Sequence, residues 1–364
     1  MTTPRSYRQR SEPLPMRRES VTSHWLTRTL QHRYPDVVVE EMKVIGVHAG
    51  HTTKLRLQLN LNQAGIQAGI PAQVCLKSNW SGDPMSSSIC ALEARFYRYA
   101  RDEIAVPAPQ CYYADWDEGA AEQGLIVMED LGGAGVFGQS TAPLNIDQAA
   151  QSLEGLAALH AGWWNSPKLQ QHKWLEQSMF AVADVDQYRI LAPYIRLNLE
   201  KPAYQAVLPK WLLDDPERLG RAFDRLVRSE RDRAGPLCLV HGDAHLGNSY
   251  LRADGGRIWF DWQLIRKGRP WRDVTYFLIG SLRIEDRRKA ERDLLRHYRE
   301  SLRARGVADL MSPDEIWSEY RRWPVYGMVS WLSNQDAWGQ IGLPSVERFY
   351  AAAADLDTLT VVEG

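Results

Sequence analysis

The sequence predicts an α+β protein with two lobes, a small sheet-rich N-terminal lobe and a large helical C-terminal lobe. Strand-like runs gather in the first 131 residues, helical periodicity dominates after residue 145, and the glycine-rich run "LGGAGVFG" separates the two parts. A block of strands followed by a block of helices favours α+β over alternating βαβ units. A chain of 364 residues can build two cores. We expect a flexible tail over 1–20, an N-lobe over 21–130 and a C-lobe over 131–364.

In the first part, apolar periodicity predicts two helices and five strands. The run "SVTSHWLTRTLQHRYP" has helical spacing and ends at a proline, and "SSSICALEARFYRYARDE" opens with serines that can cap a second helix. The strand-like runs are "VVVEEMKVIGV", "TTKLRLQLNL", "AQVCLKS", "QCYYADWD" and "QGLIVMEDL". Clean alternation in the second run is typical of a strand with one buried face.

The second part is predicted to be a helical body that carries a small β-hairpin. Long helices are indicated by "NIDQAAQSLEGLAALHAGWW" and "PERLGRAFDRLVRSERDR". Short strands are expected within "GPLCLVHGD", "NSYL" and "RIWFDWQ", and the chain from "WRDVTYFLIGSL" onward is mostly helical.

Composition excludes several classes of partner. The net charge of −1 gives no basic face for nucleic acid or an anionic membrane, so neither partner is expected. The four cysteines form no Cys-x-x-Cys pair, which indicates a reducing, cytoplasmic location. The polar N-terminus lacks the apolar core of a secretory signal, and no apolar stretch is long enough to span a membrane.

The run "LVHGDAHLGNSYL" holds the densest group of chemically active side chains, and two patterns compete within it. His241, Asp243 and His245 could form a metallohydrolase cluster, but such sites need further ligands from distant segments, and the other histidines form no second cluster. Asp243 and Asn248 instead match the kinase spacing of a carboxylate that activates a hydroxyl and an amide that binds Mg²⁺. We favour this pattern, which leaves His245 as a loop residue near the acceptor.

The same chemistry needs three more groups, and the sequence offers a candidate for each. Asp261 ends the apolar run "RIWFD", where a second metal-binding carboxylate would stand. Lys77 lies in the strand-like run "AQVCLKS", and Glu93 lies on the helix that follows it. A strand lysine paired with a helix glutamate is the arrangement that holds nucleotide phosphates in kinases. Alone, Lys77 would be an ordinary solvated strand lysine.

These motifs, with "LEARFYRYA" and "LAALHAGWW", resemble the aminoglycoside phosphotransferase/choline kinase-like family of small-molecule kinases. Within it, "FDWQLIRKGRPWRDVTYFL" and "EARFYRYARDEIAVPAPQCYYADWD" are most similar to the ecdysteroid-kinase-like branch. The resemblance covers about residues 35 to 300 and rests on the order and spacing of the motifs together. It implies a bilobal, protein-kinase-like fold and an ATP- and Mg²⁺-dependent transfer of phosphate to a small-molecule hydroxyl.

The resemblance also implies a role for each candidate residue. Asp243 would be the catalytic base, Asn248 and Asp261 the Mg²⁺ ligands, Lys77 the contact to the α- and β-phosphates, Glu93 its partner, and the backbone of Glu129 and Leu131 the adenine contact. His241 would brace the loop, and Asp273 would be a structural acid at a helix start. The phosphate-covering loop keeps only Gly46 and Gly50 of the kinase glycine pattern, which leaves GTP open as an alternative to ATP.

Other interpretations remain beside this one. A catalytically silent nucleotide- or ligand-binding pseudokinase is the main rival, although none of the catalytic residues is lost. An aminoglycoside-type kinase would need an acidic cleft for a polycation, whereas this chain offers aromatic residues, so a neutral or lipophilic alcohol is the expected acceptor.

Three smaller features have competing interpretations. The basic run Arg266–Arg272 is expected to be a solvated turn rather than an anion site. His160 is expected to be a satisfied core histidine. Aromatic residues late in the chain are equally consistent with core packing and with an acceptor pocket: Trp323, Tyr326, Trp331 and Trp338.

Overall fold

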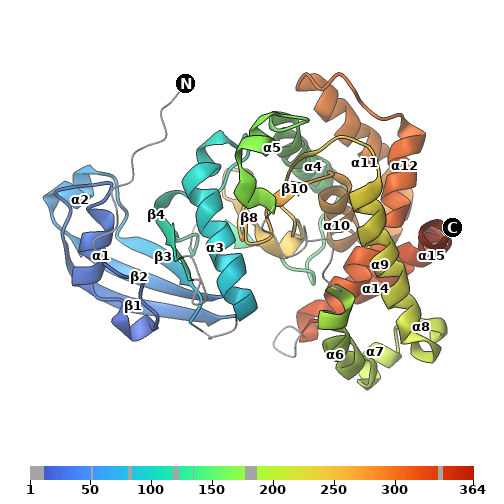
Figure 1. The fold of residues 1–364 in the computed structure, drawn as a ribbon, viewed down its shortest axis with the longest axis horizontal. Helices are drawn as coiled ribbons and strands as arrows, with labels where there is room; N and C mark the ends of the chain where they lie inside the picture. Colours follow the sequence, from blue (N-terminus) through green and yellow to red (C-terminus); the bar gives the residue numbers. More distant parts are fainter. Residues whose placement is uncertain are drawn as a thin grey trace. The chain divides into compact units, whose positions relative to one another are not determined.

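A computed structural model describes residues 12–50, 52–80, 84–117, 123–133, 135–176, 187–334 and 339–364. The chain forms two compact units (Figure 1). The first comprises residues 1–135 together with 258–264, and the second comprises residues 136–257 and 265–364. The predicted α+β class is confirmed, because the first unit is built on an antiparallel sheet and the second is mostly helical.

The first unit contains a five-stranded antiparallel sheet in the order β1-β2-β3-β5-β4. Its elements are α1 (Ser23–Leu30), β1 (Val39–Ala49), β2 (Thr53–Leu61), α2 (Gln63–Gln67), β3 (Gln73–Ser78), α3 (Pro84–Tyr99), β4 (Cys111–Trp116) and β5 (Gly124–Glu129). All five predicted strands are present, with β1 ending two residues beyond the predicted run. The predicted first helix begins later than its apolar run, at the Thr22 cap, whose side chain accepts a hydrogen bond from the Trp25 N–H.

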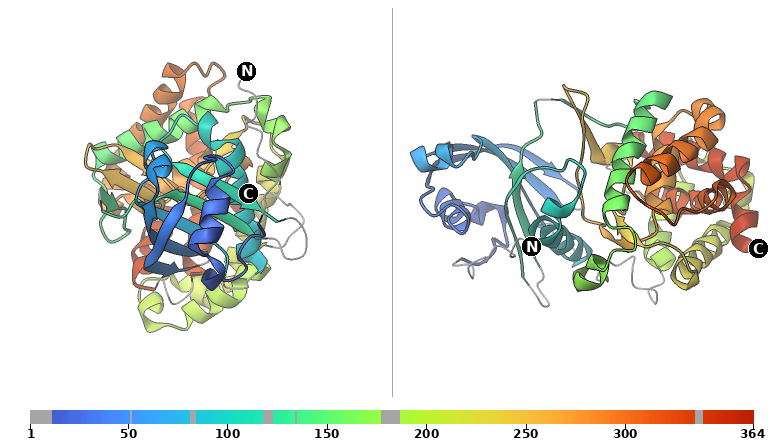
Figure 2. Two further views of the ribbon diagram at one scale, coloured as in Figure 1. Left: turned by 90° about the vertical axis from the view of Figure 1, so that its left-hand side faces the viewer. Right: turned by 90° about the horizontal axis from the view of Figure 1, so that it is seen from above.

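Alternation along β2 separates the two faces of the sheet. Leu55, Leu57 and Leu59 are buried in a core that α1 covers (Figure 2). Leu14 joins this core, so part of the expected N-terminal tail packs against the sheet, while residues 1–11 lie outside the described residues. The polar side chains between the leucines, including Lys54, lie on the opposite face, because successive strand residues point to opposite sides.

Helix α3 approaches the sheet closely at Gly124 on β5. A Cβ placed on Gly124 would lie 2.3 Å from the backbone of Cys90 on α3, so only glycine allows this contact. The Gly124 carbonyl accepts hydrogen bonds from the Ser78 hydroxyl at 2.7 Å and from the Cys90 thiol at 3.1 Å. This three-way contact fixes α3 beside the end of β3, and Glu93 lies one turn beyond Cys90.

The second unit is a helical body with short strands. Its helices are α4 (Ile146–Gly162), α5 (Lys168–Gln171), α6 (Gln187–Leu199), α7 (Pro202–Gln205), α8 (Lys210–Asp214), α9 (Pro216–Asp232), α10 (Trp271–Ser281), α11 (Ile284–Ala304), α12 (Pro313–Arg322), α13 (Pro324–Leu332), α14 (Gly339–Asp355) and α15 (Thr358–Glu363). The strands β7 (Cys238–Val240) and β10 (Arg266–Gly268) pair antiparallel. A further small sheet has the order β6-β8-β9, formed by Gly135–Phe137, Ser249–Arg252 and Arg257–Trp259.

Sequence signals account for the best-predicted helix of this unit. Helix α4 begins after Asn145, whose side chain and that of Gln148 form a reciprocal capping box. The helix packs along α11 and β7. None of the helices in the described ranges is long and apolar enough to cross a lipid bilayer.

The prediction that the basic run is a solvated turn is wrong. Arg266, Arg269 and Arg272 are at most 7% exposed, and the run forms strand β10 and the start of α10. Arg269 donates to the carbonyl and the carboxylate of Glu230 at 2.9 and 3.0 Å. Side-chain partners and strand pairing therefore take these guanidinium groups out of water, which a run of charges does not reveal.

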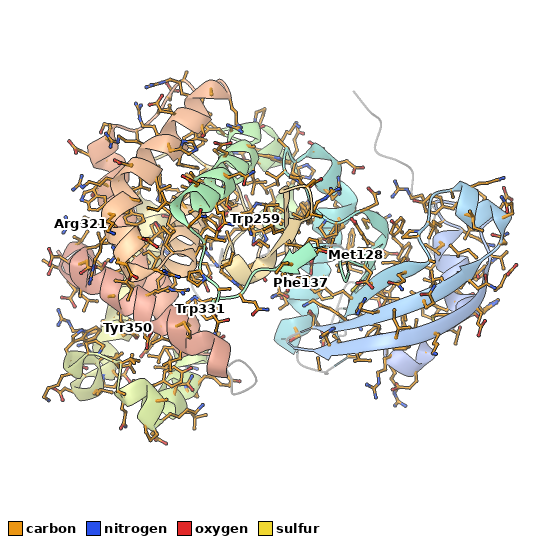
Figure 3. The ribbon with its side chains drawn as sticks, turned by 180° about the vertical axis from the view of Figure 1, so that it is seen from behind. Met128, Phe137, Trp259, Arg321, Trp331 and Tyr350 are labelled. Atoms are coloured by element: carbon orange, nitrogen blue, oxygen red, sulfur yellow. The ribbon has the colours of Figure 1, made fainter. Side chains whose placement is uncertain are left out.

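The late aromatic residues pack inside the second unit. Trp323, Tyr326 and Trp331 are all buried, with Trp331 on α13 (Figure 3). Trp338, the fourth predicted member, lies outside the described residues.

Candidate active site

Lys77 is the centre of a buried ion-pair network in the first unit. Its ammonium group, fully buried, contacts the carboxylate of Glu93 and donates to Asp261 Oδ1 at 2.6 Å. Glu93 is also fully buried, and the Asp261 side chain is 11% exposed. The structure thus brings together three of the predicted residues, including one that follows 184 positions after Lys77.

A second lysine, which the sequence analysis missed, completes this network. Lys54 Nζ donates to Asp261 Oδ2 at 3.2 Å. Lys54 on β2 is the register partner of Lys77 on β3, so both side chains lie on the same face of the sheet. The run "TTKLRLQL" contained this signal, because its lysine occupies the polar phase of an alternating strand.

The charges of the network perturb one another strongly. Burial opposes the charged form of Lys77, but the carboxylates of Asp261 and Glu93 outweigh burial and raise its pKa. Burial likewise opposes ionisation of Asp261, and the two lysines overcome it and lower its pKa well below the ordinary range. For Glu93, burial prevails over the attraction of Lys77 and raises the pKa.

The segment that carries Asp261 is fixed by its neighbours in the first unit. Asp261 has a φ of 63°, a left-handed backbone conformation that aspartate tolerates better than most residues. The next residue, Trp262, donates its backbone N–H to Glu93 Oε1 at 3.1 Å. Its indole ring stacks on Phe96 of α3 with centroids 4.4 Å apart. Glu93 therefore holds both Lys77 and the backbone beside Asp261.

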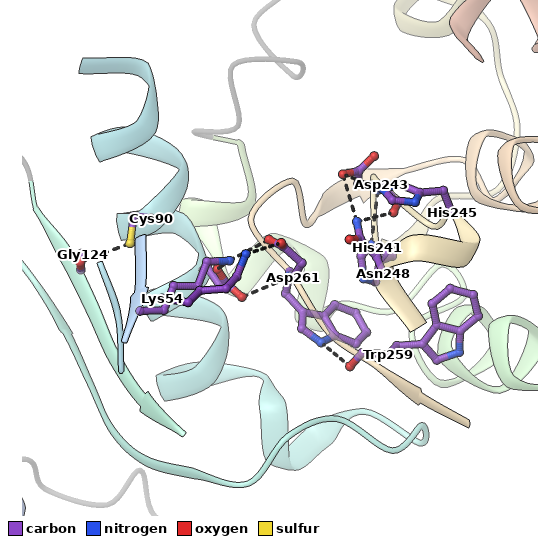
Figure 4. A network of polar contacts seen from close by, with 12 residues as sticks. Lys54, Cys90, Gly124, His241, Asp243, His245, Asn248, Trp259 and Asp261 are labelled. Atoms are coloured by element: carbon purple, nitrogen blue, oxygen red, sulfur yellow. Dashed lines mark hydrogen bonds and ion pairs between the residues drawn. The ribbon is translucent and has the colours of Figure 1, made fainter. Parts of the chain in front are cut away.

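In the second unit, Asp243 and Asn248 are joined by direct hydrogen bonds (Figure 4). The Asn248 amide donates to the Asp243 carbonyl oxygen and to its Oδ2 atom, both at 3.0 Å. Because these bonds engage the amide nitrogen, the amide oxygen is the atom that could bind a cation. The Asp243 side chain is 17% exposed, so its carboxylate can reach a substrate.

Asp273, at the start of α10, stabilises the Asp243 loop through hydrogen bonds to its backbone. The Asp273 carboxylate accepts from the backbone N–H groups of His241 at 2.6 Å and Gly242 at 2.9 Å. Gly242 has a φ of 83°, which favours glycine at this position. The Nδ1 atom of buried His241 lies 3.3 Å from the Asp243 N–H, which donates to it. This bond ties the His241 ring to the backbone of its own loop, which agrees with the predicted bracing role.

His160 is a buried core histidine, as predicted. Its Nδ1 lies 2.7 Å from the Tyr298 hydroxyl, and its Nε2 lies 3.3 Å from Asp273 Oδ2. Burial opposes ionisation of Asp273, but the hydrogen bond to His160 and the loop contacts prevail and lower its pKa.

His245, in the same loop as Asp243, lies against aromatic side chains of the second unit. Its ring centroid is 5.2 Å from that of Trp331 and 5.9 Å from that of Tyr276. Its Nε2 atom is 3.8 Å from Asp243 Oδ2. Burial, followed by the charge of Asp243, raises the pKa of the Tyr276 hydroxyl well above its usual value, so this hydroxyl stays protonated at neutral pH. We call the residues His245, Tyr276 and Trp331 the aromatic shelf.

Asn248 in the second unit and Asp261 in the first unit each carry donor atoms that suit a hard divalent cation. An amide oxygen and a carboxylate are the ligands that Mg²⁺ prefers, and Mg²⁺ usually keeps water and substrate phosphates as its remaining ligands. Within the described ranges, no group of three or more His, Cys, Asp and Glu side chains is placed to hold a metal ion.

The predicted adenine contacts lie at the end of β5. The Glu129 N–H already donates to the Gln110 carbonyl oxygen at 2.8 Å, and the Glu129 carboxylate accepts from the Gln110 N–H at 3.1 Å. Leu131 follows β5 in an irregular segment.

Solved structures similar to this chain include antibiotic phosphotransferases. A GDP complex of wild-type aminoglycoside 2′-phosphotransferase-IIIa is 14% identical, with a TM-score of 0.48 and coverage of 91% of this chain and 99% of that one. An AMP-bound spectinomycin phosphotransferase is 13% identical, with a TM-score of 0.49 and coverage of 94% and 99%. The type I macrolide 2′-phosphotransferase is 16% identical, with a TM-score of 0.44 and coverage of 92% and 98%. No curated protein sequence matches this chain.

Two residue pairs of this chain are typical of kinase-type phosphotransferases. One is a strand lysine paired with a helix glutamate, and the other is an aspartate and an asparagine five residues apart on a loop. The sequence model of the ecdysteroid kinase-like family matches residues 88–308, more than half of the chain. The chain belongs to the ecdysteroid kinase-like family and is a small-molecule kinase.

Proposed function

We propose that this kinase transfers the γ-phosphoryl group of ATP to a hydroxyl of a neutral, ring-containing alcohol. The observation that carries the proposal is the pair formed by Asp243 and Asn248, braced by buried Asp273. This arrangement holds the Asp243 carboxylate at a partly exposed position and leaves the amide oxygen of Asn248 available as a ligand.

In this proposal Asp243 acts on the acceptor hydroxyl. Its carboxylate orients the hydroxyl and takes its proton as the oxygen attacks the γ-phosphorus. A new P–O bond forms to the acceptor, the bond between the γ-phosphorus and the bridging oxygen breaks, and ADP leaves with the electron pair. The hydrogen bond from Asn248 to Asp243 Oδ2 leaves Oδ1 as the natural proton acceptor.

The other predicted residues would act on the nucleotide. Lys77, oriented by Glu93, would contact the α- and β-phosphates and neutralise negative charge during transfer. Asn248 and Asp261 would hold Mg²⁺, which supplies charge neutralisation at the phosphates when bound. The backbone of Glu129 and Leu131 would meet adenine, with Glu129 contributing its carbonyl because its N–H is engaged by Gln110.

The aromatic shelf supports the neutral acceptor. Tyr276 stacks on Trp331, and His245 meets Trp331 edge-on and lies close to Asp243. Aromatic rings of this kind favour apolar, ring-shaped molecules, since they bury apolar area and leave ring edges for hydrogen bonds. A polycation would call for several carboxylates there. The family description points the same way, because an ecdysteroid is a polyhydroxylated ring system.

The decisive experiment screens an acceptor library for MgATP-dependent mass gain, with wild type and Asp243→Asn in parallel. The variant should lose transfer by a factor of about 10³ or more while it still binds nucleotide. The matched control is Asp254→Asn, which removes an exposed carboxylate from the same unit and should keep full activity. Full transfer by Asp243→Asn would overturn the role of Asp243, and nucleotide binding without transfer in wild type would indicate a pseudokinase.

The acceptor class is tested by the same library. Neutral ring alcohols should be phosphorylated, and Trp331→Ala should raise their KM more than it changes the KM for ATP. Phosphorylation confined to aminoglycoside polycations would exclude the neutral acceptor.

A further inference from the structure

We propose that Lys54 is a second phosphate-binding lysine, which contacts the nucleotide beside Lys77. The inference rests on the proposed function and adds to it a residue that neither the family motif nor the sequence spacing assigned. It starts from the relation between two neighbouring strands, because Lys54 and Lys77 are register partners whose ammonium groups both contact Asp261.

The two lysines differ in how firmly they are held. Lys77 is fully buried and contacts both Glu93 and Asp261. Lys54 has 31% of its side chain exposed and contacts only Asp261 within the described residues. A flexible, partly solvated ammonium group can exchange its partner at low cost, whereas a buried one between two carboxylates cannot.

A cation bound to Asp261 would compete with both lysines for the same two carboxylate oxygens. Its Oδ1 atom faces Lys77 and its Oδ2 atom faces Lys54. Of the two atoms, Oδ2 carries the longer contact, 3.2 Å against 2.6 Å, and is therefore the more available ligand. If a cation takes this oxygen, Lys54 needs a new anionic partner, and a phosphate oxygen is the strongest partner that a nucleotide offers.

The position of Lys54 along the chain agrees with this role. The turn between β1 and β2 is the place where kinases cover the phosphates with glycine-rich backbone. Here β2 begins at Thr53, directly after this turn, and the turn region keeps only Gly46 and Gly50 of the usual glycines. A lysine at the start of β2 supplies positive charge beside a turn whose non-glycine residues let the backbone approach a phosphate less closely.

The test measures binding as well as turnover, with Lys54→Met and Lys54→Arg. Isothermal titration with a non-hydrolysable ATP analogue and Mg²⁺ should show about tenfold weaker binding for Lys54→Met and near wild-type binding for Lys54→Arg. Adenosine, which has no phosphate, should bind both variants as it binds wild type. The matched control is Lys43→Met, which removes an exposed lysine from β1 and should change neither affinity.

A labelling experiment on wild-type protein removes any dependence on the folding of the variants. An amine-reactive reagent should modify Lys54, and the ATP analogue with Mg²⁺ should protect it while adenosine does not. Equal binding of the analogue by Lys54→Met and wild type, or labelling of Lys54 that the analogue leaves unchanged, would overturn the inference. An equal loss of adenosine binding would show a merely structural role and would also overturn it. If wild type bound the analogue but transferred no phosphate, the proposed function would fail while the role of Lys54 would stand or fall on the binding data.

Discussion

The ammonium group of Lys77 and the Oδ1 atom of Asp261 lie 2.6 Å apart, although 184 positions separate them in the chain. Strand β3 and the segment that follows β9 thus share one ion-pair network. Because Glu93 contacts the Lys77 ammonium and also accepts from the Trp262 N–H, this network fixes side chains and backbone together.

Lys77→Met should destabilise the protein by about 3 kcal/mol, because two carboxylates lose their shared buried cation. Chemical unfolding followed by circular dichroism measures this loss. The double variant Lys77→Met/Glu93→Leu should recover part of the stability, since it also removes a buried acid, but it should not recover nucleotide binding. Recovery of both properties would show that Lys77 has no part in binding.

Asp273→Asn should lower the free energy of unfolding by about 2–3 kcal/mol at pH 7, because the carboxylate accepts hydrogen bonds from two backbone N–H groups of the Asp243 loop. The folded pKa of Asp273 is lowered, so its contribution is fully present above the ordinary pKa of 3.8 and is lost as the pH falls towards the lower folded value. The difference in free energy of unfolding between wild type and Asp273→Asn should therefore become smaller below about pH 4. A difference in free energy of unfolding that stays constant down to pH 2 would contradict this account of Asp273.

Arg269→Ala should destabilise the second unit by about 2 kcal/mol, since the guanidinium group is 5% exposed and bonded to Glu230. Lys267→Ala is the matched control from the same run, because its partner Glu176 is 59% exposed. The control should cost at most about 0.5 kcal/mol. Thermal unfolding compares the stability of the two variants. Equal destabilisation would mean that the buried Arg269 contributes no more to stability than the control residue Lys267.

The four cysteine thiols should resist alkylation in the native protein at pH 8. Burial raises the pKa of Cys75, Cys90 and Cys111 to about 12 and that of Cys238 well above its ordinary value. Mass spectrometry after iodoacetamide treatment should therefore find unmodified thiols in the native protein and four modified thiols in guanidinium chloride. Rapid native labelling of Cys90 would show that α3 separates readily from Gly124.

Local patterns were sufficient for most elements of the fold. Alternation predicted β2 through Leu55, Leu57 and Leu59, and the helical pattern of "NIDQAAQSLEGLAALHAGWW" predicted α4. The pairing of Lys77 with Glu93 followed from the order of a strand and a helix. In each case the signal lies within one element or between two adjacent ones.

The features that the sequence did not reveal depend on distant partners. Lys54 has the appearance of an ordinary strand lysine until Asp261 is placed beside it. Arg269 and Arg272 read as solvated charges because their partners Glu230 and Tyr326 lie on other elements. Charge alone does not say whether a side chain stays in water, since a remote partner can offset the cost of burial.

The grouping of residues 258–264 with the first unit also bears on synthesis at the ribosome. A nascent chain that has emerged only as far as residue 135 holds the complete five-stranded sheet but lacks Asp261. In such a chain the two lysines, Lys77 and Lys54, face only one carboxylate, that of Glu93, so one positive charge has no acidic partner. More than a hundred further residues must be synthesised before Asp261 can complete the ion-pair network of the sheet. A fragment that ends at Gly135 would leave Lys77, Lys54 and Glu93 exposed to water without this partner.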